Sequence, residues 1–97
     1  MTEALVVLMK KYGRTLTGRE DGKKAFLEIS SNYAPPIILD FDDVMALGSS
    51  FGDEVIPKLA IRQGSILSVR NANKSIQSCM KKILEDIQFS VKIDYVD

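Results

Sequence analysis

Apolar residues are arranged along the chain in two kinds of segment that alternate with each other. Three short, mainly apolar runs, at positions 5–9, 37–41 and 65–69, have the composition that is typical of buried strands. The segment 89–95 instead alternates between apolar and polar residues. A period of two predicts a strand with one face in water, and we therefore expect this strand at an edge of a sheet.

The segments between these strands have a helical pattern. The strongest signal follows Asn73, which is expected to cap the helix. The apolar positions of this helix recur every three or four residues and form one stripe, expected to face the sheet: Ile76, Cys79, Met80, Ile83, Leu84 and Ile87.

Two further helices are predicted. One covers about 18–31 and ends before the prolines at 35 and 36. The other begins at Ser49 or Ser50, because either hydroxyl can serve as an N-cap. Pro57 interrupts this second pattern, which predicts either a kink there or a regular helix that begins only near Asp53.

The resulting order of elements is β-α-β-α-β-α-β, which is typical of an α/β layer fold. A chain of 97 residues has room for one hydrophobic core, so we expect a single domain over residues 1–97. Because the last strand has a wet face, the helices are expected to pack mainly on one side of the sheet.

Composition argues against several classes of function. Thirteen basic and thirteen acidic residues balance, which leaves no excess positive field for nucleic acid or an anionic membrane. The lack of histidine removes the commonest general base and zinc ligand, and Cys79 is the single cysteine. The apolar run at 4–9 is too short to cross a bilayer. We therefore expect a cytoplasmic protein without nucleic-acid or membrane partners, cofactor or metal, in which Cys79 is a buried apolar residue.

An acidic cluster follows the second predicted strand. Asp40-Phe41-Asp42-Asp43-Val44 resembles the D-x-D-x-[TV] motif of haloacid-dehalogenase-type phosphotransferases, in which the first aspartate is the nucleophile and the second an acid/base. This resemblance implies a small magnesium-dependent phosphotransferase that uses Asp40 and Asp42. The later acidic pair of that family has no counterpart in a suitable place, and 97 residues are too few for its usual core. The non-catalytic alternative is a solvated acidic loop.

The stretch 38–54 resembles the signature of STAS domains, the anti-sigma-factor antagonists. In that signature an apolar strand ends in L-D-[LF], an apolar loop position follows, and D-S-[ST]-G opens a helix. Leu39 and Asp40 align with the strand end, Val44 with the loop position, and Ser49 with the serine that is phosphorylated. The form found here, L-D-F-x-x-V followed by S-F-x-D-E, is closer still to the STAS-like domain family of unknown function.

This resemblance implies a fold, a kind of activity and a partner. The implied fold is a mixed β-sheet of about four strands with about three helices packed mainly on one face. The implied activity is that of a non-catalytic bacterial regulatory module. Such a module docks a GHKL-type ATPase that doubles as anti-sigma factor and serine kinase, and phosphorylation at the helix start blocks the docking by adding charge.

The resemblance also selects candidate residues. Ser49 and Ser50 are the candidate phosphoacceptors, although Gly48 and Phe51 stand where the family usually has aspartate and glycine. The expected partner-binding residues surround these serines or lie at the same end of the sheet: Met45, Gly48, Ser49, Ser50, Phe51, Asp53 and Arg70. Met45 and Phe51 are expected to be exposed apolar anchors. Arg70 is either a second contact residue or the partner of a nearby aspartate.

Overall fold

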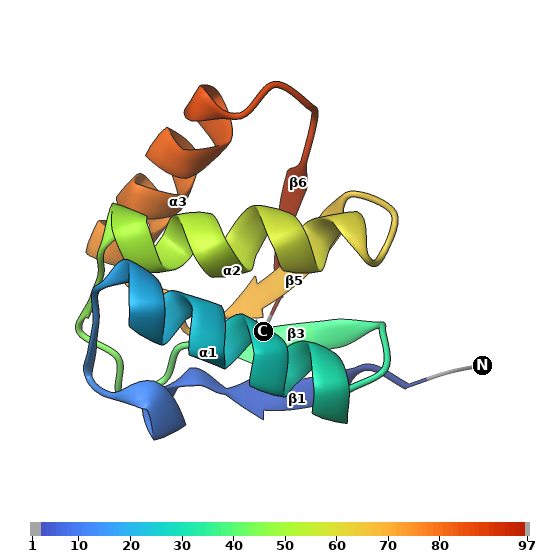
Figure 1. Cartoon of the computed structure of the whole chain (residues 1–97), viewed down its shortest axis with the longest axis horizontal. Helices are drawn as coiled ribbons and strands as arrows, with labels where there is room; N and C mark the ends of the chain where they lie inside the picture. Colours follow the sequence, from blue (N-terminus) through green and yellow to red (C-terminus); the bar gives the residue numbers. More distant parts are fainter. Residues whose placement is uncertain (1–2, 97) are drawn as a thin grey trace.

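The computed structural model describes residues 3–96 and has one main sheet of four strands (Figure 1). The strands are ordered β1-β3-β5-β6 across this sheet. Their bounds are Leu5–Leu8 for β1, Ile37–Asp40 for β3, Ile66–Arg70 for β5 and Lys92–Tyr95 for β6. All three pairings are parallel. The α/β class and the edge position of the last strand are confirmed. The sheet is parallel rather than mixed, because a helix returns the chain to the same end before each new strand.

Three helices connect these strands: α1 (Arg19–Asn32), α2 (Ser49–Ile61) and α3 (Lys74–Asp86). The strand order advances in one direction, so right-handed connections place all three helices on the same face, as expected and as Figure 1 shows. Within residues 3–96 no helix is both long enough and apolar enough to cross a membrane.

Three short elements were not predicted. Met9–Tyr12 forms a 3-10 turn, η1, so β1 ends one residue earlier than its apolar run. The two-residue strands β2 (Thr15–Leu16) and β4 (Ala46–Leu47) pair in parallel and form a separate small sheet. This pairing holds the segment before α1 against the segment before α2.

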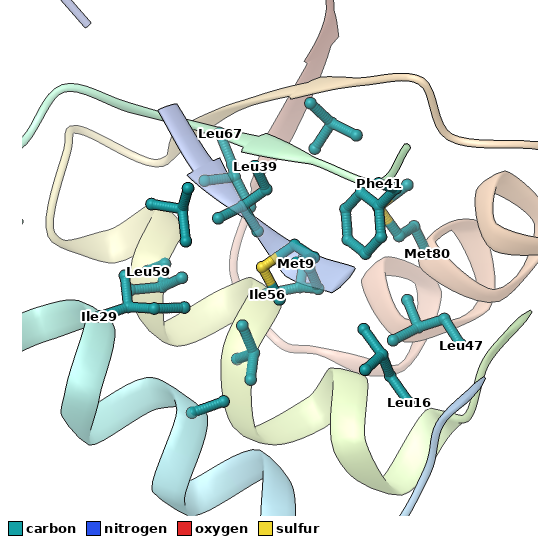
Figure 2. Packing of buried hydrophobic residues seen from close by; sticks show 14 of the residues in the cluster. Met9, Leu16, Ile29, Leu39, Phe41, Leu47, Ile56, Leu59, Leu67 and Met80 are labelled. Carbon is teal, nitrogen blue, oxygen red and sulfur yellow. The ribbon is translucent and has the colours of Figure 1, made fainter. Parts of the chain in front are cut away.

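The hydrophobic core lies between the main sheet and the three helices. Figure 2 shows Leu39 and Leu67 of the sheet facing Ile29, Ile56 and Leu59 of the helices. Leu16 and Leu47, from the small sheet, are also buried, and they close the core near the start of α2. On α3, three members of the predicted stripe are fully or almost fully buried: Ile76, Met80 and Ile83. The predicted stripe faces the core at these three positions, whereas Cys79, Leu84 and Ile87 are only half-buried.

Helix α2 is packed closely between its two neighbours. It runs from Ser49 to Ile61 with Pro57 inside it, so the alternative of a late start near Asp53 is wrong. At Gly22 of α1, a Cβ atom would lie 2.7 Å from the backbone oxygen of Phe51. At Gly52, a Cβ atom would collide with the Cδ1 atom of Ile83 on α3. Gly22 therefore permits a close approach of α1 and α2 that a larger residue would prevent, whereas at Gly52 the obstacle is the end of the flexible Ile83 side chain.

Candidate functional site

The candidate site lies where the strands of the main sheet end and the next helices begin. Helix α2 begins after the loop that follows β3, and α3 begins after β5. Parallel strands place these two helix starts at the same edge of the sheet. The side-chain amide of Asn73, before α3, donates a hydrogen bond of 2.9 Å to the backbone oxygen of Met45, before α2. The two starts are therefore joined directly.

The loop 41–48 is fixed by hydrogen bonds of its backbone. The Phe41 N–H donates to the Arg70 carbonyl at 2.9 Å, and the Val44 N–H to the Phe41 carbonyl at 3.0 Å. Farther along, the Met45 N–H donates to the carbonyl of Arg14, and the Gly48 N–H to that of Leu16, each at 2.7 Å. The side chain of Met45 is nevertheless 58% exposed. The loop thus presents one apolar side chain on a well-held backbone.

The start of α2 has no side-chain cap. Gly48 occupies the N-cap position, and Ser49 and Ser50 are the first two helical residues, so the prediction that a serine is the N-cap is wrong. The Gly52 N–H donates to the Gly48 carbonyl at 2.9 Å. The N–H groups of residues 49–51 come before this first helical hydrogen bond and therefore have no acceptor within the helix, as at the start of any α-helix. Both serine side chains are exposed beside them.

Ser49 also lines a pocket of about 350 Å³ between α2 and α3. The wall on α3 consists of residues on one helical face: Ser75, Ser78, Cys79 and Lys82. The three polar residues of this wall were not predicted from the sequence, although their spacing of three or four positions places them together. Lys82 supplies a positive charge to a pocket that is otherwise lined by hydroxyls, the thiol and Leu47.

Cys79 borders the apolar stripe of α3 and is half-buried rather than fully buried. Burial raises the pKa of its thiol, and the negative charge of Asp53 raises it further, while the charge of Lys82 acts in the opposite direction. The net pKa lies above its ordinary value, so the thiol is protonated at neutral pH.

Phe51 does not have its expected role. Its side chain is 1% exposed and belongs to the core, so the prediction that it is an exposed anchor is wrong. The reason is its direction: residue 51 of α2 faces inward, while Ser49 and Ser50 face solvent. Asp53 is partly exposed, and its carboxylate lies 3.9 Å from the guanidinium of Arg19 on α1.

Arg19 mainly holds the neighbouring Glu54, which is buried within α2. The Glu54 carboxylate accepts hydrogen bonds of 2.6 Å from Lys58 and from Arg19. Lys58, followed by Arg19, holds the pKa of this carboxyl below its ordinary value. The first turns of α2 are thus tied to α1 by an ion pair as well as by the contact at Gly22.

Arg70 pairs with Asp40, as the alternative prediction for Arg70 proposed. The Arg70 Nε donates to one Asp40 oxygen at 3.0 Å, while the other accepts from the Asn71 side chain and the Asp42 N–H, each at 2.9 Å. Asp40 and Arg70 alternate with the buried Leu39 and Val69, so they lie on the helix-free face of the sheet. Arg70 therefore supports Asp40 rather than the surface around Ser49.

These contacts decide the chemistry of Asp40. Burial raises its pKa, but the hydrogen bonds from Asn71, the Asp42 backbone and Arg70, together with the charge of Arg70, outweigh burial and hold the pKa below its ordinary value. Both oxygens of the expected nucleophile are thus already engaged. Within residues 3–96 no group of three or more acidic or cysteine side chains is placed to hold a metal ion. The arrangement does not favour a phosphotransferase.

A parallel sheet with three helices on one face, and a serine pair at the start of the helix that follows the second long strand, are consistent with the resemblance to STAS domains. A family model described as a STAS-like domain of unknown function (DUF4325) matches residues 21–77, more than half of the chain, and the chain belongs to this family. The matched part extends from α1 into α3 and includes Ser49. Neither the curated proteins nor the solved structures contain a match to this sequence.

Proposed function

We propose that this chain is a non-catalytic regulatory module that docks a protein partner through the start of α2 and the loop before it. The docking surface consists of Met45, Gly48, Ser49, Ser50 and Asp53. The observation that carries the proposal is the uncapped start of α2, where two exposed serines follow a loop that carries an exposed methionine. A partner in keeping with the STAS resemblance is a GHKL-type ATPase that acts as anti-sigma factor and serine kinase.

The surroundings of Ser49 favour a phosphoserine switch. A phosphate adds about 1.5–2 negative charges. It would be attracted by the N–H groups and the positive dipole end of α2, and by Lys82 across the pocket. Asp53, one helical turn farther on, would repel it. The helix start and Lys82 would hold the phosphate, while its charge and bulk would remain on the surface that the partner has to cover.

Met45 supplies the apolar part of the same surface. Methionine side chains are flexible and adapt to different partner surfaces. Here the side chain projects from a backbone that Arg14 and Asn73 hold from two directions. A partner that buries this side chain would gain apolar contact without having to order the loop.

The docking surface can be tested by using the purified chain as bait in an extract of the native host. Proteins retained by wild type, Ser49→Asp, Ser49→Ala and Ser50→Ala are quantified by mass spectrometry. We expect Ser49→Asp to weaken binding of one partner at least tenfold, about 1.4 kcal/mol, while both alanine variants bind normally. Ser31→Asp is the control, because Ser31 is exposed near the opposite end of the molecule, in the last turn of α1. Equal retention by all variants would remove the proposed surface.

The kinase step needs a separate measurement. The partner recovered in this way is mixed with the purified chain and ATP, and phosphate is located by mass spectrometry. We expect phosphate on Ser49, lost in Ser49→Ala and retained in Ser31→Ala. Phosphate at another residue, or none, would refute the phosphoserine switch while leaving the docking surface in place.

A further inference from the structure

A second surface lies between α3 and β6, and it adjoins the pocket that Ser49 lines, since Ser78 lines both. A groove of about 700 Å³ runs between α3 and the edge strand β6. Its apolar side chains come from both elements: Leu84 from α3, and Val91, Ile93 and Tyr95 from β6 and the residue before it. Tyr95 is 50% exposed although it lies on the same side of the strand as the half-buried Ile93. The groove therefore has an apolar floor that the described residues leave open.

The backbone of β6 forms one wall of this groove. The N–H groups of Lys92 and Val96 donate to carbonyls of Ser65 and Val69, on the β5 side, at 2.9 Å each. Backbone groups of a strand point alternately to its two sides, so those of Ile93 and Tyr95 point to the open edge of the sheet. An open edge beside a helix is the geometry in which an extended peptide adds as a further strand.

The charged residues that line the groove are all positive. Three exposed lysines are spread along its length: Lys74 at the start of α3, Lys81 two turns later and Lys92 at the start of β6. Within residues 3–96 none of the three takes part in an ion pair. No carboxylate side chain lines the groove, although Asp94 follows Lys92 on the same face of β6.

We propose that this groove binds an extended acidic segment of a protein partner, which pairs with β6 as an additional strand. Apolar side chains at alternate positions of the segment would cover the floor around Ile93 and Tyr95. Its carboxylates would lie near Lys74, Lys81 and Lys92. A second copy of this chain fits less well, because pairing of two β6 edges would bring the lysines of both copies together.

The probe is a library of random short peptides displayed on phage and selected against the immobilised chain. We expect the selected peptides to combine alternating apolar residues with an excess of Asp and Glu. One of them is then synthesised and titrated into ¹⁵N-labelled protein, where the amides of residues 91–96 and of α3 should shift. Selection of no shared sequence, or shifts confined to other residues, would overturn the proposal. So would tighter binding of a single-stranded oligonucleotide to the same amides, because that would assign the groove to nucleic acid.

Two pairs of variants separate charge from backbone pairing. Lys81→Glu combined with Lys92→Glu should weaken peptide binding at least tenfold, whereas Lys23→Glu with Lys24→Glu, the same charge change on α1, should not. Tyr95→Pro and Tyr95→Ala both remove the ring, but only proline removes the N–H at the open edge. We expect Tyr95→Pro to bind several-fold more weakly than Tyr95→Ala. Equal affinities would show that no strand is added, and circular dichroism confirms that each variant is folded.

Discussion

Helices α2 and α3 begin side by side at the same edge of the sheet, yet the two starts are built differently. Asn73 caps α3, because its side-chain oxygen accepts a hydrogen bond of 2.9 Å from the Ile76 N–H. The amide nitrogen of the same side chain holds the carbonyl of Met45. The N-cap of α2 is Gly48, which has no side chain to act as a cap, and the two serines after it are exposed.

This difference separates polar residues that stabilise the fold from exposed residues that remain available for binding a partner. At the ends of β3 and β5, polar side chains are engaged within the chain, as in the group formed by Asp40, Arg70 and Asn71. In the segment 42–50, Asp42, Met45 and Ser49 are exposed although the backbone is well held. A surface of the second kind can be changed without unfolding the protein, which is what a regulatory contact requires.

The largest difference in stability is expected between variants of two methionines, one buried and one exposed. Met80 is fully buried on α3, so Met80→Ala should lower the free energy of unfolding by about 2–5 kcal/mol. Met45 is exposed, and Met45→Ala should change it by less than about 0.5 kcal/mol. Urea denaturation measures both values. A similar loss in the two variants would show that Met45 is part of the fold rather than a free surface group.

An intermediate effect is expected for two aspartates. Asp40→Asn removes the charge that Arg70 and Asn71 hold, and it should lower the free energy of unfolding by about 1.5–3 kcal/mol at neutral pH. Asp42→Asn should change this free energy little. Because the folded pKa of Asp40 is below its unfolded value of about 4, its contribution is complete above pH 4 and is lost as the pH falls through the folded pKa. We therefore expect the difference in free energy of unfolding between wild type and Asp40→Asn to become smaller below pH 4, when unfolding is measured from neutral to acid pH. A difference in free energy that does not depend on pH would contradict a stabilising role of the ionised Asp40 carboxylate.

The smallest effect concerns the two helix starts themselves. Asn73→Ala removes a cap and should cost about 1 kcal/mol, or about 4–8 °C in the melting temperature of a domain of this size. Ser49→Ala removes no cap and should stay within about 0.5 kcal/mol of wild type. Thermal denaturation followed by circular dichroism compares them. If Ser49→Ala is the more damaging change, the serine is structural and the contrast between the two starts is lost.

Periodic segments of the sequence predicted most of the fold. The stripe on α3 and the cap at Asn73 were identified correctly because a long helix repeats its signal over several turns. The two-residue strands β2 and β4 were missed, since two residues cannot display a period. The sheet direction was expected to be mixed, although three helical connections between neighbouring strands are the pattern of a parallel sheet.

The candidate site was predicted in outline but not in detail. The register of the STAS resemblance located the start of α2 correctly, but it carried no information on which side chains face inward, and Phe51 proved to be buried. Ser75, Ser78 and Lys82 were missed because they approach Ser49 only when α3 packs beside α2. Contacts of this kind, between residues distant in the sequence, have no signature in either segment alone.

The close packing at Gly22 has a consequence for the rate at which a partner binds. Because the backbone of α1 at Gly22 lies directly against the backbone of Phe51, the first turn of α2 is packed tightly on its neighbour. We therefore expect a partner to meet this turn already in place, so that association follows a single bimolecular step. Charge added at Ser49 then acts on the frequency of productive encounters and on the lifetime of the complex, and ionic strength tunes the first of these through screening.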